Sequence, residues 1–198
     1  MNRRAVPADA AEVRAIFDET IALHRRMRDM DPAPIVAAAA AIREAVHLGG
    51  KLLIFGNGGS AADSQHLATE LVGRFVRERR ALPAIALSTD TSILTAVAND
   101  YGFNRVFARQ VEALGRPGDI AFGISTSGNS PSVLEAIEVA KVRELTTVAL
   151  TGRDGGAIGA AADIHINVPD AATPRVQEVH RTLIHVICEL VEREFVKE

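Results

Sequence analysis

Five short runs of almost entirely apolar residues are spaced along the chain, and patterns typical of amphipathic helices lie between most of them. A strand that is apolar on both sides must be buried on both faces, as happens in a parallel sheet covered by helices. The runs are KLLIF (51–55), AIALS (84–88), IAFGIS (120–125), TVALT (147–151) and DIHINV (163–168). We therefore predict an α/β fold, a doubly wound five-stranded parallel sheet flanked by helices.

The predicted helices lie before, between and after these strands. An N-terminal helical segment spans about 9–48, and its second part, the alanine-rich stretch 33–48, ends at Gly49-Gly50. Its first part, 9–27, carries an apolar stripe of Val13, Ile16, Phe17 and Ile21. The remaining helical patterns span 60–73, about 91–98, 105–114, 131–142 and about 173–194. No linker or repeat interrupts them, so residues 1–198 are expected to form a single domain with a sheet core at about 51–168.

Composition and charge exclude several classes of function. The net charge of −3 gives no reason to expect nucleic acid or an anionic membrane as a partner. The only cysteine, Cys188, allows neither an internal disulfide nor a multi-thiolate zinc site. The N-terminus lacks the apolar stretch of a signal peptide and no segment approaches a membrane span, so a cytoplasmic protein is expected. The clustered Arg74, Arg77, Arg79 and Arg80 are interpreted as a solvated helix end and loop.

The first predicted strand ends in Gly56-Asn57-Gly58-Gly59-Ser60, directly before a helix. Glycines let the backbone approach a ligand closely, and a helix N-terminus presents free N–H groups, so this segment predicts an anion site. Its spacing also fits the dinucleotide fingerprint G-x-G-x-x-G/A, which requires an acidic residue about twenty positions further on. The acid at the next strand exit, Asp90, lies more than thirty positions away, which argues against that alternative. No Gly-Lys-Ser/Thr follows, which excludes a P-loop.

The third predicted strand ends in a run of hydroxyl side chains, Ser125, Thr126, Ser127 and Ser130, before Pro131. Helix capping by Ser130 explains one of the four, and phosphate binding accounts for the others. Neither of these two loops contains Lys or Arg, which suits a sugar monophosphate better than a nucleoside triphosphate. A third glycine-rich exit, 151–156, is explained equally well as a turn.

The helix predicted after the first loop carries His66 and Glu70 on one face, with Asp63 nearby. Such a pair is often only a surface contact worth a few tenths of a kcal/mol. Its position beside the glycine loop favours an acid–base or metal pair instead.

Further candidates lie on the last predicted helix. Gln177 and His185 are about two turns apart and can face one cleft, whereas His180 points elsewhere, about 140° from His185. A histidine on a helix is more often packed or solvated than catalytic, so these positions alone do not define a site.

Several motifs resemble those of the sugar isomerase (SIS) domain family, in the same order, over about residues 9–194. They are GNGGSAADSQHLATEL, ALSTDTSILTAVANDYGF, GISTSGNS, LTGRDGG and the R-x-Q-E-x-H pattern at 175–180. Within the family the chain most resembles the isomerases of sedoheptulose 7-phosphate. The resemblance implies an aldose–ketose isomerisation through an enediol that yields D-glycero-D-manno-heptose 7-phosphate. It also implies a homotetramer, assembled through the N-terminal helices, with active sites at subunit interfaces.

The resemblance also assigns roles to individual residues. Glu70 would be the catalytic base and His185 the acid. One zinc ion per subunit would be held by His66, Glu70, Gln177 and His185, a donor set that suits zinc chemically. The substrate-binding positions would be Asn57, Gly58, Gly59, Ser60, Glu70, Asn99, Asp100, Ser125, Thr126, Ser127, Ser130 and Gln177.

Two other readings stay open. One is a non-catalytic SIS-domain protein that associates with a replication initiator. Such proteins lack the acid and the histidine that stand here as Glu70 and His185. The other is an isomerase acting on a different sugar phosphate, since the segment 171–175 ahead of Gln177 varies within the family.

Overall fold

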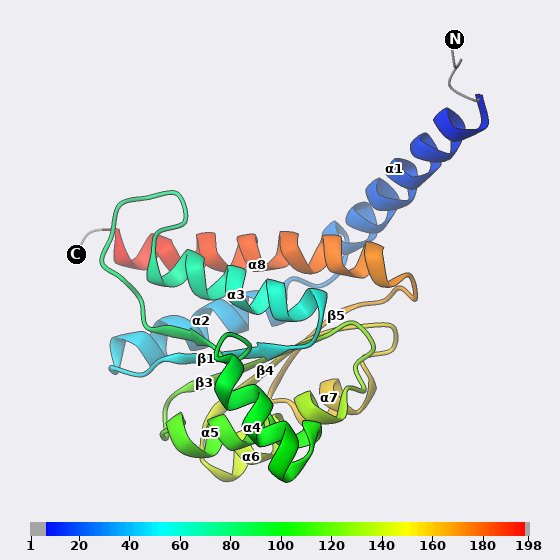
Figure 1. Ribbon diagram of the computed structural model, residues 1–198. Helices are drawn as coiled ribbons and strands as arrows, with labels where there is room; N and C mark the ends of the chain where they lie inside the picture. Colours follow the sequence, from blue (N-terminus) through cyan, green and yellow to red (C-terminus); the bar gives the residue numbers. More distant parts are fainter. Residues whose placement is uncertain (1–6, 197–198) are drawn as a thin grey trace, which may run out of the picture.

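The computed structural model describes residues 7–196, which form a five-stranded parallel sheet with helices on both faces (Figure 1). The strand order is β2-β1-β3-β4-β5, so the chain moves outward from β1 to β2 on one side and from β3 to β5 on the other. The predicted doubly wound α/β fold is confirmed. The strands are β1 Leu52–Gly56, β2 Ala84–Ala86, β3 Ile120–Ser125, β4 Thr146–Gly152 and β5 Ile164–Val168.

Two layers of helices bury the sheet. One core cluster packs α2 (Ala33–His47), α3 (Gly59–Val72) and α8 (Thr173–Phe195) against one face. A second cluster packs the helices between β2 and β5 against the other face, as Figure 1 shows. These helices are α4 (Thr91–Tyr101), α5 (Ala108–Leu114), α6 (Pro131–Val142) and α7 (Gly156–Ala161), with the short 3-10 turn η1 (Phe103–Arg105). The central strands β1 and β3 are buried along their whole length, which explains their apolar sequence.

The structure departs from the sequence prediction in three places. The strand predicted at 84–88 stops at Ala86, because β2 is an edge strand that pairs only with β1. The helix predicted over 105–114 is divided into η1 and α5. Helix α7 was not predicted, because its glycine- and alanine-rich sequence resembles a turn.

The first helix, α1 (Pro7–Arg28), extends away from the body of the molecule (Figure 1). Its second half is anchored by hydrogen bonds such as the one between His24 Nε2 and Thr182 Oγ1 of α8. The predicted apolar stripe of Val13, Ile16, Phe17 and Ile21 therefore does not pack into the core; Phe17 is 64% exposed. Within residues 7–196 no helix is both long and apolar enough to cross a membrane.

A buried histidine joins α8 to the sheet. His180 is fully buried and its Nε2–H donates to the main-chain oxygen of Thr151 at the end of β4, at 2.9 Å. A carbonyl can only accept, so this bond places the proton on Nε2. Burial lowers the pKa of His180, since the charged imidazolium would lose its hydration.

Acidification is expected to destabilise the fold through this group. Its folded-state pKa lies below the unfolded value of about 6.5, so the unfolded chain alone takes up the proton as the pH falls below that value. The free energy of unfolding, measured by urea denaturation at one protein concentration, should fall between about pH 6.5 and 5, by up to about 1.4 kcal/mol per pH unit and proton.

A His180→Gln variant should show a shallower pH dependence of this free energy over the same range. The surface variant Gln65→Asn, which alters no titratable group, should show the wild-type dependence. Carboxyls whose pKa is lowered, such as that of Asp163, titrate at lower pH and do not contribute in this range. Identical slopes in all three proteins would contradict this prediction.

Candidate functional site

The loops that follow β1 and β3 lie side by side where the strand order reverses. In doubly wound sheets this switch point is where ligands bind, because neighbouring loops diverge there. Asn57 after β1 joins the two loops: its Nδ2 donates to Ser130 Oγ at 2.8 Å and to Ser132 Oγ at 2.9 Å after β3.

A small polar pocket of about 140 Å³ lies between these loops. Its lining residues are Asn57, Ser60, Ile124, Ser125, Thr126, Ser127 and Ser130. These side chains offer hydroxyl and amide groups, and the start of α3 contributes the positive end of its dipole. A cavity of this size, with neutral donors and no Lys or Arg among the lining residues of the described chain, suits a phosphate monoester.

Ser130 corrects one part of the sequence interpretation. It occupies the N-cap position of α6 and Pro131 follows in the first turn, but its side chain makes no capping hydrogen bond. Its hydroxyl instead accepts the hydrogen bond from Asn57 and faces the pocket. Capping therefore does not explain Ser130, because its oxygen is turned toward the neighbouring loop.

Two positions at the start of α3 favour glycine, each for a different physical reason. Gly58 has φ +56°, a left-handed conformation that residues with a Cβ adopt at a cost. At Gly59 a Cβ would lie 2.3 Å from Gln177 Nε2, so the lack of a side chain there leaves room for the Gln177 amide in its present position. The loop thus turns sharply and then leaves space for this amide beside α3.

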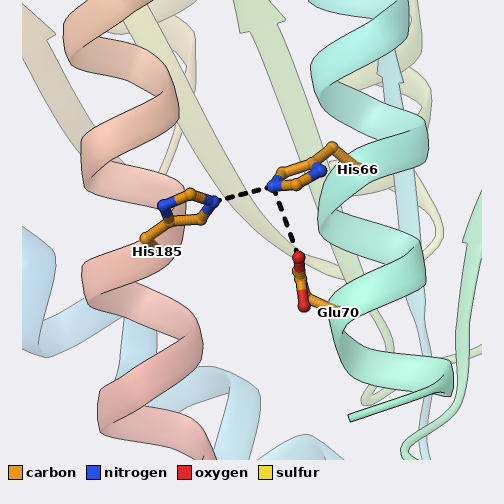
Figure 2. A group of neighbouring side chains, drawn as sticks. All are labelled: His66, Glu70 and His185. Atoms are coloured by element: carbon orange, nitrogen blue, oxygen red, sulfur yellow. Dashed lines mark hydrogen bonds and ion pairs between the residues drawn. The ribbon is translucent and has the colours of Figure 1, made fainter. Parts of the chain in front are cut away.

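Helices α3 and α8 bring three potential metal ligands together. Figure 2 shows His66 and Glu70 of α3 pointing toward His185 of α8. The two Nε2 atoms of His66 and His185 are 2.7 Å apart, and His66 Nε2 lies 3.4 Å from Glu70 Oε1. All three side chains are half-buried, and one donor atom from each lies within 4.8 Å of the others.

The surroundings favour the neutral form of His66 and pack against the His185 ring. Burial, followed by the nearby charge of Arg181, lowers the pKa of His66, which favours the uncharged form that binds metals. The Phe75 ring packs against His185, with 5.4 Å between the ring centroids. Phe75 is not among the predicted site residues, because a lone aromatic residue after a helix carries no functional signal.

The three groups fit a zinc ion. At most one proton can lie between two imidazole nitrogens, so the cluster directs further lone pairs toward a common point, which a cation would complement. Two ligands bound to tetrahedral zinc at about 2.0–2.1 Å lie roughly 3.4 Å apart, which matches the separation of His66 and Glu70. The two histidine nitrogens are closer, at 2.7 Å, so zinc binding would move the rings slightly apart.

Gln177, the fourth predicted ligand, lies two turns before His185 on α8, against Gly59. It lines an open groove of about 610 Å³ together with Asp63 and Arg181. The Asp63 carboxylate, predicted to lie near His66, is bound to Arg181 at 2.6 Å. The groove lies beside the start of α3, and none of the three triad residues lines it.

Several candidate residues lie outside this arrangement. Asn99 and Asp100 are exposed on the last turn of α4, where Asn99 Nδ2 donates to Asp100 Oδ1, and they line neither of the two pockets above. His180 faces β4 and not the triad. The interpretation of the arginine cluster was wrong for Arg79, whose side chain is 1% exposed and paired with buried Glu192.

The fold agrees with comparisons to known proteins. The SIS domain family model matches residues 15–152, and the chain belongs to this family. A curated phosphoheptose isomerase of Trichlorobacter lovleyi is 56% identical over 177 residues, which cover 89% of this chain and 90% of that protein. One of a Roseiflexus species is 53% identical over 195 residues, covering 97% and 98%.

A solved structure is similar over nearly the whole fold. The phosphoheptose isomerase GmhA from Neisseria gonorrhoeae superimposes with a TM-score of 0.88 at 46% identity. The match covers 93% of this chain and 98% of that one. The resemblance inferred from the motifs is thereby confirmed.

Replacing Ser130 separates capping from ligand binding. Because its hydroxyl makes no cap, Ser130→Ala should lose clearly less than the roughly 1 kcal/mol of stability that a capping serine contributes. The affinity of the Ser130→Ala variant for inorganic phosphate, measured by titration calorimetry, should nevertheless fall severalfold, because the pocket has lost one hydroxyl donor.

Asp90→Ala is the matched control. Asp90 does cap α4, by accepting from the Ile93 N–H at 2.9 Å. This variant should lose about 1 kcal/mol of stability and keep its phosphate affinity. The reverse pattern in the two variants would contradict the assignment of the pocket.

Proposed function

We propose that this chain is an aldose–ketose isomerase that converts D-sedoheptulose 7-phosphate into D-glycero-D-manno-heptose 7-phosphate, a step of heptose biosynthesis. The observation that carries the proposal is the cluster of His66, Glu70 and His185 beside a phosphate-sized pocket. The names of the highly similar relatives point to the same reaction.

The spacing of the two parts supports a substrate of this length. Ser60 in the pocket and His66 in the triad are on the same helix, six residues and about 9 Å apart along its axis. That is the scale of an extended seven-carbon sugar with its phosphate at one end. The phosphate would be bound by Ser125, Thr126, Ser127 and Ser130, with the loop residues Asn57, Gly58, Gly59 and Ser60 contributing N–H and amide groups. The reacting carbons would then reach the triad.

The isomerisation needs one proton moved between neighbouring carbons and another between their oxygens. Glu70 takes the proton from C1 of the ketose while His185 gives a proton to the C2 carbonyl oxygen, which produces the 1,2-enediol. Glu70 then returns a proton to C2 as His185 recovers one from the C1 hydroxyl, which leaves the aldose. No proton is gained or lost overall.

Zinc is the proposed cofactor, one per subunit, held by His66, Glu70 and His185 with the Gln177 amide as fourth ligand. When bound, it supplies Lewis-acid polarisation of the carbonyl and hydroxyl oxygens. A carboxylate has two oxygens, so one of Glu70 can bind metal while the other accepts the proton. Gln177, which lines the groove beside Gly59, would also contact the sugar hydroxyls.

The protein is further proposed to be a homotetramer with active sites at subunit interfaces. The support is the apolar stripe of α1, which extends from the body and leaves Phe17 and Val13 more than half exposed. Asn99 and Asp100 are predicted to contact substrate but lie outside both pockets of their own chain. At a subunit interface these two residues would reach the substrate bound by a neighbouring subunit.

Turnover should depend on both predicted catalytic residues. We expect NMR of the purified protein with sedoheptulose 7-phosphate and zinc to show formation of the heptose 7-phosphate. Glu70→Gln and His185→Ala should each lower kcat by about 10²–10⁴, because each removes a proton-transfer group. The surface variant His47→Gln serves as the control.

A folded wild-type protein that fails to turn over this ketose with or without zinc would contradict the proposed reaction. Turnover of a different phosphoketose alone would correct the substrate. No turnover of any sugar phosphate would favour a binding protein of the replication-initiator-associating kind.

The oligomer should dissociate when the α1 stripe is charged. Phe17→Glu places a carboxylate where apolar surface would be buried, so light scattering after size exclusion should show a smaller species than the wild type. Asp18→Asn, on the adjacent position of the same helix, should leave the assembly unchanged. A monomeric wild-type protein would contradict the tetramer.

A further inference from the structure

Arg79 and Glu192 form a buried ion pair at the far end of the α3–α8 contact. The Arg79 and Glu192 side chains are 1% and 2% exposed, and Arg79 Nε lies 3.6 Å from Glu192 Oε1. A buried ion pair contributes little net stability compared with apolar residues at the same positions. Its presence here therefore suggests a role other than stabilising the fold.

Arg79 donates hydrogen bonds to the C-terminal carbonyls of α3, the helix that carries Glu70. The last carbonyls of a helix lack partners within it and carry partial negative charge. The Arg79 Nη2 donates to the main-chain oxygen of Glu70 at 2.6 Å. Its Nη1 donates to the oxygens of Leu71 at 2.9 Å and Gly73 at 3.1 Å. The guanidinium thus holds the backbone of Glu70 itself.

Glu192 fixes the segment that follows the same helix. Its carboxylate accepts hydrogen bonds from three consecutive main-chain N–H groups, those of Phe75, Val76 and Arg77, at 2.9–3.3 Å. Phe75 is the residue whose ring packs against His185. Glu192 lies two turns after His185 on α8, so one helix face carries both the ligand and the group that positions its aromatic neighbour.

The triad therefore lies between two connections that join α3 to α8. Asp63 and Arg181 link the helices before it, and Arg79 and Glu192 link them after it. We propose that Arg79 and Glu192 are positioning residues, which hold Glu70 and His185 at the separation that metal binding and proton transfer require. This inference rests on the proposed function of the triad.

The test uses Glu192→Gln and Arg79→Lys in the full-length protein. Zinc affinity is measured by competition with a chelating dye, the absorption spectrum of the Co²⁺ form reports ligand geometry, and kcat and KM are measured separately. Zinc affinity and kcat should each fall about 10–100-fold, with KM changing by less than about threefold because the phosphate pocket is distant. The Co²⁺ spectrum should change as well.

A double variant separates positioning from stability. Arg79→Met with Glu192→Leu removes both charges and leaves neither buried alone, so only the loss of their hydrogen bonds to the main chain should lower its thermal stability. Its zinc affinity should remain low, because the carbonyls of α3 and the loop N–H groups have lost their partners. The matched controls are Glu189→Gln and Arg77→Lys, which alter exposed residues next to the pair.

If the variants that fold keep the zinc affinity, kcat and Co²⁺ spectrum of the wild type, the positioning role is overturned, whatever their melting temperatures. That result is distinct from failure of the proposed function, in which the wild-type protein itself would neither bind zinc nor isomerise sugar phosphates. Zinc binding by the wild type that is weakened in the variants, without turnover, would support the positioning role alone.

Discussion

The close side-by-side packing of α3 and α8 is the constraint on which the site depends. The two helices contact each other along their length in the same order, from Gly59 against Gln177, through Asp63 with Arg181, to His66 against His185. Glycine at position 59 leaves room for the Gln177 amide, which a Cβ there would meet. Since the triad takes ligands from both helices, a shift of one helix by a turn would separate them.

The doubly wound sheet supplies the second half of the site. Because the strand order reverses between β1 and β3, the loops after these strands diverge and leave the small hydroxyl-lined pocket between them. Helix α3 starts at this pocket and carries His66 and Glu70 about two and three turns later. One helix therefore links the pocket proposed to bind a phosphate to residues of the triad proposed to move protons, and the substrate chain would lie along it.

Local patterns were enough for most of the fold. Apolar runs of five or six residues predicted every strand, and the bounds of β3 and α6 matched to the residue. Patterns failed where local composition was ambiguous or where tertiary pairing set the limit. Helix α7 is built mainly from glycine and alanine, and the edge strand β2 ends at Ala86, opposite Ile54, before its partner β1 ends at Gly56. The interpretation of the arginine cluster as solvated was wrong for a related reason. Its composition gave no sign that Arg79 would be buried against Glu192, more than a hundred residues away.

The sequence by itself determined the fold class, the family and the residue types at the site, because periodicity and motif order are properties of neighbouring positions. Only the tertiary structure decided which of those residues meet. It joined His66 and Glu70 to His185 and turned the Ser130 hydroxyl away from its own helix toward Asn57. It also left Asn99 and Asp100 outside both pockets and enclosed Arg79. Contacts between distant segments depend on how helices pack on the sheet, and no local pattern encodes that packing.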